Sequence, residues 1–232
     1  MEKAKTHSPT LRILVHIAGW IPLIVLLIDF FNENLTVNPI QAIEQRTGKI
    51  ALTFLMASLA CTPLSVISGV KILSKPKKAL GNYGFLYACI HLVTFFIIDY
   101  GLDFQAIWND VSNKPYIIVG TIAFTLLFPL AFTSFKYWKK KLGKNWKRLH
   151  RLVYIISPLV VFHFFLVVKG SITTLQGDII QPLIYGSIVL VLLILRIPKV
   201  KLFIINLRSR ITRRYHTKNA ASEKRIPITL EK

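Results

Sequence analysis

The chain has 232 residues, of which 53% are hydrophobic, and a mean hydropathy of +0.52. This composition excludes an ordinary soluble domain and is typical of a small membrane protein with several spans. The formal net charge of +20 is compatible with nucleic-acid binding, but the basic residues are confined to alternate connections, which argues against that class.

Six apolar stretches follow one another along the chain, each about 20 residues long. A helix of that length rises about 30 Å, enough to cross the hydrocarbon core of a bilayer. The sequence therefore predicts an all-α, polytopic membrane protein with six transmembrane helices. It divides into an N-terminal segment 1–10, a transmembrane domain 11–197 and a basic C-terminal tail 198–232. The expected spans are 11–31, 48–70, 80–102, 115–135, 150–169 and 179–197.

Charges alternate between successive connections. Residues 136–151 carry eight Lys and Arg side chains and no acid, and basic residues also fill 71–78, the N-terminal segment and the tail. The other three connections carry the acids Glu33, Glu44, Asp99, Asp103, Asp110 and Asp178. This positive-inside pattern predicts that both termini are cytoplasmic. It explains the net charge by topology and anionic lipid headgroups, so the bilayer is an expected partner and nucleic acid is not.

Two histidines lie near the middle of separate spans. Counting about 1.5 Å per residue from the cytoplasmic edge puts His91 roughly 17 Å deep and His163 roughly 20 Å deep. Imidazoles are costly in hydrocarbon unless their nitrogens find partners, and two at one depth can supply both axial ligands of a haem iron. We therefore expect a haem between them; the alternative is that they only bridge helices. Gly81 and Gly84 before His91 allow close approach of either a helix or a flat macrocycle.

His16 and His150 form a second layer near the cytoplasmic surface. They are candidates for a further haem, although water or lipid headgroups would satisfy them as well. His150 and His163 are 13 residues apart, which rotates them by about 220° on an ideal helix. A kink at Pro158, between them, would change this phase.

No nucleotide-binding motif accompanies the spans, since the chain has neither a G-x-G-x-x-G run after a strand nor a P-loop. Electrons would therefore come from a membrane quinol or a separate reductase. The basic cytoplasmic face offers cations for a flavin phosphate or an acidic donor protein, or these cations act only as topology determinants. The candidates are Lys77, Lys78, Lys144 and Arg148.

Two runs of sequence are distinctive. The first is LGKNWKRLHRLVY (142–154), which is followed by a mid-helix histidine, and the second is RTGKIALTFLMASLACTPL (46–64). Others are HIAGWIPL (16–23), LGNYGFLYACIHL (80–92), LAFTS (130–134) and QPLIYG (181–186). Together they resemble the haem-binding membrane subunits of the periplasmic methionine sulfoxide reductase system, over about residues 11–197. That family belongs to the wider group of ferric-reductase-like membrane domains.

The resemblance implies a ferric-reductase-like haem-binding bundle in the bacterial inner membrane. It implies b-type haem, one or two per chain, and flavin mononucleotide (FMN) as a further cofactor. By position, His91, His150 and His163 match the family's haem histidines, and His16 matches its first-helix histidine. Typical ferric-reductase-like domains carry another histidine on the third helix, where this chain has Lys77 and Lys78.

The resemblance also implies partners. The chain would be an electron-transfer subunit that forms a heterodimer with a periplasmic molybdopterin enzyme, on which protein methionine sulfoxide is reduced. The donor would be the quinone pool or a cytoplasmic flavin reductase. The alternatives are a ferric or quinone reductase with another acceptor, and a non-redox transporter or scaffold.

Overall fold

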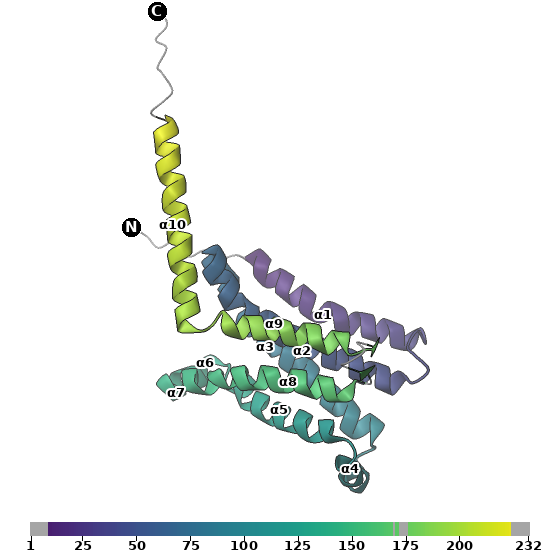
Figure 1. Ribbon diagram of the computed structural model, residues 1–232. Coiled ribbons are helices and arrows are strands. Elements are labelled where there is room, and N and C mark those ends of the chain that lie inside the picture. The colour runs from purple at the N-terminus through teal and green to yellow at the C-terminus, as the bar shows by residue number, and fades with distance from the viewer. Residues whose placement is uncertain (1–8, 169, 172–175, 224–232) are drawn as a thin grey trace, which may run out of the picture.

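The computed structural model describes residues 9–168, 170–171 and 176–223 (Figure 1). This part of the chain is helical apart from one antiparallel pair of short strands, β1 Gly170–Ser171 and β2 Gln176–Gly177. The helices are α1 Pro9–Phe31, α2 Pro39–Ser68, α3 Lys77–Val93, α4 Phe104–Val111, α5 Pro115–Phe132, α6 Lys136–Leu142, α7 Lys144–Leu149, α8 Val153–Val167, α9 Ile180–Ile194 and α10 Pro198–Glu223. Shorter 3-10 turns are η1 Lys71–Ser74 and η3 His150–Leu152, and η2 Thr94–Asp99 is a π-helix.

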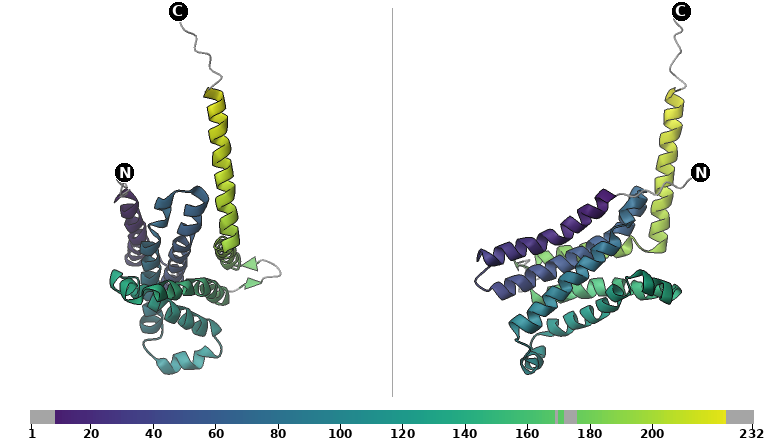
Figure 2. Two further views of the ribbon diagram at one scale, coloured as in Figure 1. Left: turned by 90° about the vertical axis from the view of Figure 1, so that its left-hand side faces the viewer. Right: turned by 180° about the vertical axis from the view of Figure 1, so that it is seen from behind.

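The long helices lie side by side as a bundle, and α10 leaves it at a steep angle (Figure 1, Figure 2). In the described residues, five helical segments are long and apolar enough to cross a membrane: Pro9–Phe31, Pro39–Ser68, Lys71–Asp99, Pro115–Phe132 and Lys144–Val167. The sixth expected span corresponds to the shorter apolar helix α9. A further turn follows this helix, because the backbone amides of Arg196 and Ile197 donate hydrogen bonds to carbonyls of its last turn. The all-α, polytopic prediction is confirmed.

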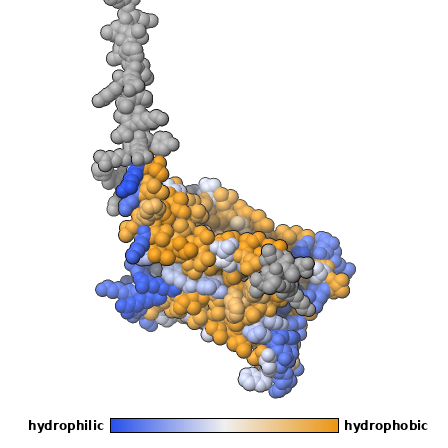
Figure 3. Space-filling model, viewed as in Figure 1, coloured by the Kyte–Doolittle hydropathy of each residue, from blue (hydrophilic) through white to orange (hydrophobic). Residues whose placement is uncertain are grey.

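On the face of the bundle seen in Figure 3, an apolar belt lies between two hydrophilic ends. Large apolar side chains on α1 are about half exposed, as lipid-facing side chains are when no bilayer covers them. The basic end carries the connections 71–78 and 136–151 together with α10, and the acidic end carries the connections 32–38 and 100–114.

Helix α2 begins nine residues before the expected span 48–70. Asn38 caps it, accepting a hydrogen bond from the Gln41 amide at 3.1 Å, and Pro39 occupies the first turn, where a missing N–H costs nothing. Gly69 ends it with φ +78°, a conformation that glycine adopts without strain. The additional turns hold Arg46, which forms an ion pair with Asp29 of α1. Hydropathy alone missed them because they are polar.

Helix α2 is the centre of the bundle. Leu52, Met56 and Leu59 pack on α9, and Leu55 packs on α5 and α8. Phe54 stacks on Tyr87 of α3, with ring centroids 5.6 Å apart. Because α2 is buried on several sides, its register along the bundle sets that of its neighbours.

Helix α10 is tied to the bundle through an arginine. Arg208 donates to the Val66 carbonyl at 2.6 Å, near the end of α2. Leu202, Phe203 and Leu207 on the same helix are about half or more exposed. Exposed apolar side chains among Lys and Arg residues are typical of a helix that lies on a membrane surface.

Helix α1 docks on α3 through one glycine. The Tyr87 hydroxyl donates to the Gly19 carbonyl at 2.8 Å, and the ring of Tyr83 lies against the Gly19 Cα. A Cβ at position 19 would lie 2.3 Å from Cζ of Tyr83. Tyr83 is buried, so its ring cannot simply swing away.

We expect Gly19→Ala to destabilise the protein by about 1–3 kcal/mol, because the added methyl overpacks the contact between α1 and α3. The measurement is the thermal unfolding midpoint in detergent. Gly81→Ala is the control, since its added Cβ would lie no closer than 3.4 Å to the nearest side-chain atom. Equal midpoints for the two variants would show that α1 does not depend on this contact.

Candidate functional site

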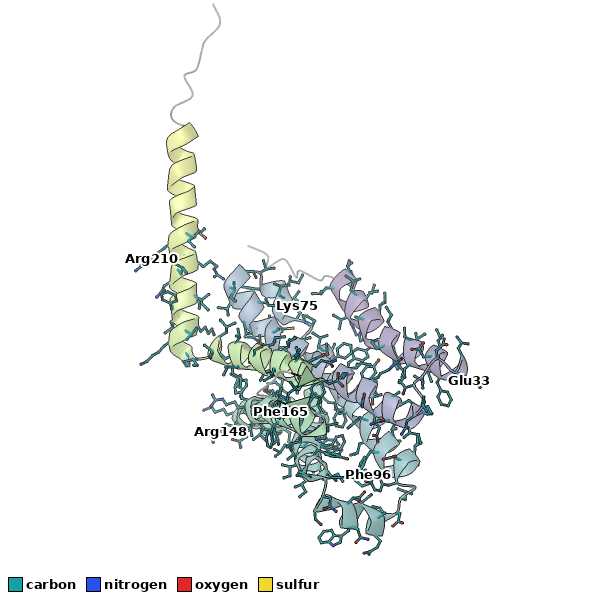
Figure 4. The ribbon with its side chains drawn as sticks, turned by 45° about the vertical axis from the view of Figure 1, so that its right-hand side comes forward. Glu33, Lys75, Phe96, Arg148, Phe165 and Arg210 are labelled. Atoms are coloured by element: carbon teal, nitrogen blue, oxygen red, sulfur yellow. The ribbon has the colours of Figure 1, made fainter. Side chains whose placement is uncertain are left out.

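Two histidines from different helices face each other inside the bundle. His91 of α3 and His163 of α8 have ring centroids 6.2 Å apart and planes inclined by 80°. Phe165, which follows His163 by two residues, is labelled in Figure 4. In the same view, Lys75 and Arg148 mark the basic end of the bundle. The structure thus brings together the two side chains that counting from the membrane edge puts at one level.

Each of these histidines is held by a backbone carbonyl of a neighbouring helix. His91 Nδ1 lies 3.0 Å from the Glu44 carbonyl oxygen of α2, and His163 Nδ1 lies 2.9 Å from the Tyr116 carbonyl oxygen of α5. A carbonyl oxygen only accepts hydrogen bonds, so Nδ1 carries the proton in both cases. Nε2 then keeps its lone pair, which is the tautomer that binds a metal ion.

A glycine four residues after each carbonyl makes room for the ring. A Cβ at Gly120 of α5 would lie 2.8 Å from Cε1 of His163, closer than atoms can approach. A Cβ at Gly48 of α2 would lie 3.4 Å from Cε1 of His91. The two helices therefore present the same local arrangement, a carbonyl followed one turn later by a glycine, to the two imidazoles.

The spacing of the rings fits a shared metal ion. With metal–nitrogen bonds of about 2.0 Å, two imidazoles on opposite sides of one ion have ring centres roughly 6.3 Å apart. The observed 6.2 Å matches this value. Among the described residues, no group of three or more His, Cys, Asp and Glu side chains could hold a metal ion. The pair itself can supply two ligands.

Ionisable side chains of α2 lie beside the pair. Glu44, whose carbonyl holds His91, has a carboxylate oxygen that is buried without a hydrogen-bond partner. Lys49 Nζ lies 5.9 Å from the ring centre of Phe164, the residue after His163. Helix α2 therefore contributes a hydrogen bond, a glycine and two ionisable groups to this region.

The glycines singled out from the sequence serve helix packing. A Cβ at Gly84 would meet the α2 backbone at 3.2 Å, and one at Gly81 would meet an α2 side chain at 3.4 Å. The sequence suggested that these glycines admit either a helix or a flat macrocycle, and their contacts show the close approach of a helix. Sequence reasoning missed Gly48 and Gly120, for which the available signal was an isolated glycine inside an apolar span.

His16 and His150 have separate partners. His16 Nδ1 lies 2.8 Å from the Tyr83 hydroxyl, between α1 and α3. His150 Nε2 lies 3.2 Å from the Thr133 hydroxyl, and its ring centroid is 4.1 Å from that of Trp146. His150 begins the 3-10 turn η3, so a count of 100° per residue from His150 to His163 does not apply. Within the part of the chain that the structure describes, neither residue is paired with another histidine.

The four basic candidates for a flavin or donor contact are exposed at the basic end. Lys77 and Lys78 begin α3, and Lys144 and Arg148 lie on α7. Lys78 Nζ lies 5.8 Å from the ring centre of Phe135, directly before α6. One cation of α3 therefore reaches toward the connection that carries the other two.

A polar network at the acidic end fixes the start of α5. Asp110 accepts hydrogen bonds from Lys114 Nζ and from the Tyr100 hydroxyl, both at 2.6 Å. The bond from Lys114 holds the pKa of Asp110 below its usual value, and the same bond raises the pKa of Lys114. Lys114 precedes α5, so the network anchors the turn that carries Tyr116, whose carbonyl holds His163.

A family comparison defines the class of protein. Residues 47–175 match the family described as "ferric reductase like transmembrane component". That range includes both histidines of the pair and His150. The chain belongs to this ferric-reductase-like transmembrane family, and it is a multi-pass membrane protein.

Relatives narrow the family further. A protein-methionine-sulfoxide reductase heme-binding subunit MsrQ from Xanthomonas oryzae pv. oryzae is 37% identical over 83% of this chain and 88% of its own length. Proteins with the same name from Herminiimonas arsenicoxydans and Pectobacterium atrosepticum are 39% and 33% identical, over 81% and 83% of this chain and 84% and 94% of their own lengths. Within the wider family, the chain is therefore a member of the MsrQ group, which confirms the resemblance found in its sequence. No solved structure matches the chain.

Proposed function

We propose that this chain is the haem-binding, electron-transfer subunit of a protein-methionine-sulfoxide reductase system. The observation that carries the proposal is the pair His91 and His163, whose ring centroids are 6.2 Å apart. We assign these two residues as the axial ligands of one b-type haem. The names of the relatives, which describe heme-binding subunits of such reductases, support this assignment.

The surroundings of the pair support its role as a pair of metal ligands. Both imidazoles have Nδ1 bound to a carbonyl, so each keeps a lone pair on Nε2 that would bind the iron. Gly48 and Gly120 leave space in which the rings adopt these orientations. When bound, the haem supplies one-electron chemistry through its iron. The protein binds the iron, fixes the two rings and excludes water by the apolar packing of α2, α5 and α8.

The proposed direction of electron transfer is supported by the family resemblance and the charge pattern. In our proposal the protein lies in the bacterial inner membrane with both termini cytoplasmic. The His91–His163 pair passes electrons on toward the periplasmic side. The donor is the quinone pool or a cytoplasmic flavin reductase. The acceptor is a periplasmic molybdopterin subunit that reduces protein methionine sulfoxide and forms a heterodimer with this chain.

An inner redox site near the basic end completes this proposal. His150, with or without His16, is the candidate for a second haem. FMN, if bound, would place its phosphate among Lys77, Lys78, Lys144 and Arg148, because these cations are exposed at that end. The separate partners of His16 and His150 favour an arrangement in which the two histidines do not share one iron.

We expect the purified protein to show Soret and α bands that sharpen on reduction with dithionite. His91→Ala and His163→Ala should each lose one haem per chain, because each removes an axial ligand. The measurement is haem and iron content per chain, with His7→Ala, in the N-terminal segment, as the control. Absence of the bands in the wild type would favour a non-redox function, and full haem content in both variants would mean that other residues bind it.

Substitution of the two glycines should have graded effects. Gly120→Ala is expected to displace His163 and lower haem content severalfold, because the second shell around a metal ligand changes affinity by about 10–100-fold. Gly48→Ala should have a smaller effect, since its Cβ would be 3.4 Å rather than 2.8 Å from the ring. The readouts are haem content and the reduction potential of the haem. Effects of equal size would argue against the role of the carbonyl–glycine arrangement.

The assignment of the acceptor has a cellular test. Deletion of the gene should abolish repair of oxidised methionines in periplasmic proteins, and expression of the wild-type chain should restore it. The His163→Ala variant should fail to restore repair if electrons pass through the haem. Unchanged repair in the deletion strain would instead favour a ferric or quinone reductase with another acceptor.

A further inference from the structure

The two halves of the site repeat one arrangement in the same register. In each half, the carbonyl that holds the imidazole lies 47 residues before the histidine, and a glycine follows that carbonyl by one helical turn. The members are Glu44, Gly48 and His91 in one half and Tyr116, Gly120 and His163 in the other. The two halves can therefore be compared position by position.

The halves differ at the position directly before the glycine. Helix α2 has Thr47 there, and α5 has Val119. The Thr47 hydroxyl donates to the Glu44 carbonyl at 3.1 Å, and this carbonyl is also the acceptor of His91. Valine has no hydroxyl, so Val119 cannot donate to the Tyr116 carbonyl. One histidine thus shares its acceptor with the side chain at this position, and the other does not.

The hydroxyl of Thr47 is confined to carbonyls of its own helix. Thr47 is 0% exposed, so bulk water does not compete for its proton. It also donates to the Ile43 carbonyl at 2.7 Å, the usual bond of a helical threonine to the residue four positions back, which Thr121 and Thr125 of α5 form as well. The additional contact with Glu44 makes a three-centre bond, in which two carbonyls share one proton.

A shared carbonyl is a weaker acceptor for each of its donors, because both donors draw on the electron density of one oxygen. The bond from Nδ1 to a carbonyl makes an imidazole a better electron donor through Nε2, and electron donation favours ferric over ferrous iron. Weakening of the bond at His91 therefore favours the ferrous state and raises the reduction potential of an iron held by the pair.

We propose that Thr47 is a positioning residue that acts through the Glu44 carbonyl on His91 and raises the reduction potential of the haem. This inference rests on the proposed function, in which His91 and His163 are axial ligands. It makes the two ligands unequal, with His91 the weaker electron donor of the pair.

The test exchanges the two side chains in the full-length, haem-loaded protein. Thr47→Val should lower the reduction potential, because His91 regains the whole acceptor. Val119→Thr should raise it, because the new hydroxyl lies in the register that Thr47 has in α2. The double variant should return to a value near that of the wild type. The measurement is a spectroelectrochemical titration in detergent.

The expected shifts are moderate. Removal of a second-shell partner changes metal affinity by about 10-fold or more, and here a bond is strengthened or weakened rather than removed. We expect the ratio of ferric to ferrous affinity to change about threefold. Because tenfold corresponds to about 59 mV for one electron, this is a shift of about 30 mV.

Two control variants separate the hydrogen bond from packing. Thr47→Ser keeps the hydroxyl and should keep the wild-type potential. Thr125→Val removes a hydroxyl that donates to the Thr121 carbonyl at 2.8 Å, away from both histidines, and should also leave the potential unchanged. If Thr47→Val does not fold, Val119→Thr still tests the proposal from the other half of the site.

A second readout does not need the haem. In the haem-free, full-length chain labelled with ¹⁵N-histidine, the Nδ1 proton of His91 should move downfield in Thr47→Val, because a stronger hydrogen bond deshields it. The Nδ1 proton of His163 should move upfield in Val119→Thr. Both resonances are measured by nuclear magnetic resonance against the wild type.

The outcomes distinguish this inference from the proposed function. Intact haem content with unchanged potentials in Thr47→Val and Val119→Thr would overturn the inference and leave the axial ligands as assigned. Shifts of the two variants in the same direction would also overturn it, since they would reflect packing. A wild type without haem bands would overturn the proposed function, and the resonance of the His91 proton would then decide alone whether Thr47 weakens that bond.

Discussion

The two hydrogen bonds from histidine Nδ1 to a carbonyl oxygen are the interactions on which the centre of this protein depends. A neutral imidazole has one donor and one acceptor nitrogen, and burial makes an unsatisfied one costly. Bonds to the carbonyls of Glu44 and Tyr116 fix the donor on Nδ1 in both His91 and His163. The acceptor nitrogens are thereby reserved for a ligand. The same bonds fix the ring orientations, since a carbonyl has a limited range of accepting directions.

These bonds impose conditions on the packing of four helices. Helices α2 and α5 provide the carbonyls, and α3 and α8 provide the histidines. A shift of α2 by one residue would move both the carbonyl of Glu44 and the gap at Gly48 away from His91. The extensive contacts of α2 with α3, α8 and α9 oppose such a shift, and the network of Asp110 and Lys114 anchors the beginning of α5. Packing far from the pair thus maintains the distance of 6.2 Å between the ring centroids of His91 and His163.

The sequence alone predicted the features that depend on one helix at a time. Hydropathy located the spans, charge distinguished their two ends, and counting the rise per residue matched the depths of His91 and His163. The carbonyl partners were not predictable in this way, because they depend on the register between helices and the side chains of Glu44 and Tyr116 do not reveal it. The polar first turns of α2 escaped the hydropathy pattern for a related reason: their partner, Asp29 of α1, lies in another helix.

The same hydrogen-bond chemistry separates the two histidine layers. His16 and His150 contact the hydroxyls of Tyr83 and Thr133, and a hydroxyl both donates and accepts. Those bonds do not select a tautomer, whereas the carbonyls beside His91 and His163 select one. His150 moreover uses Nε2 for its bond, the nitrogen that the central pair keeps for a ligand. The central pair is therefore held in the tautomer that leaves Nε2 without a proton, whereas a ligand at His150 through Nε2 would first have to displace Thr133.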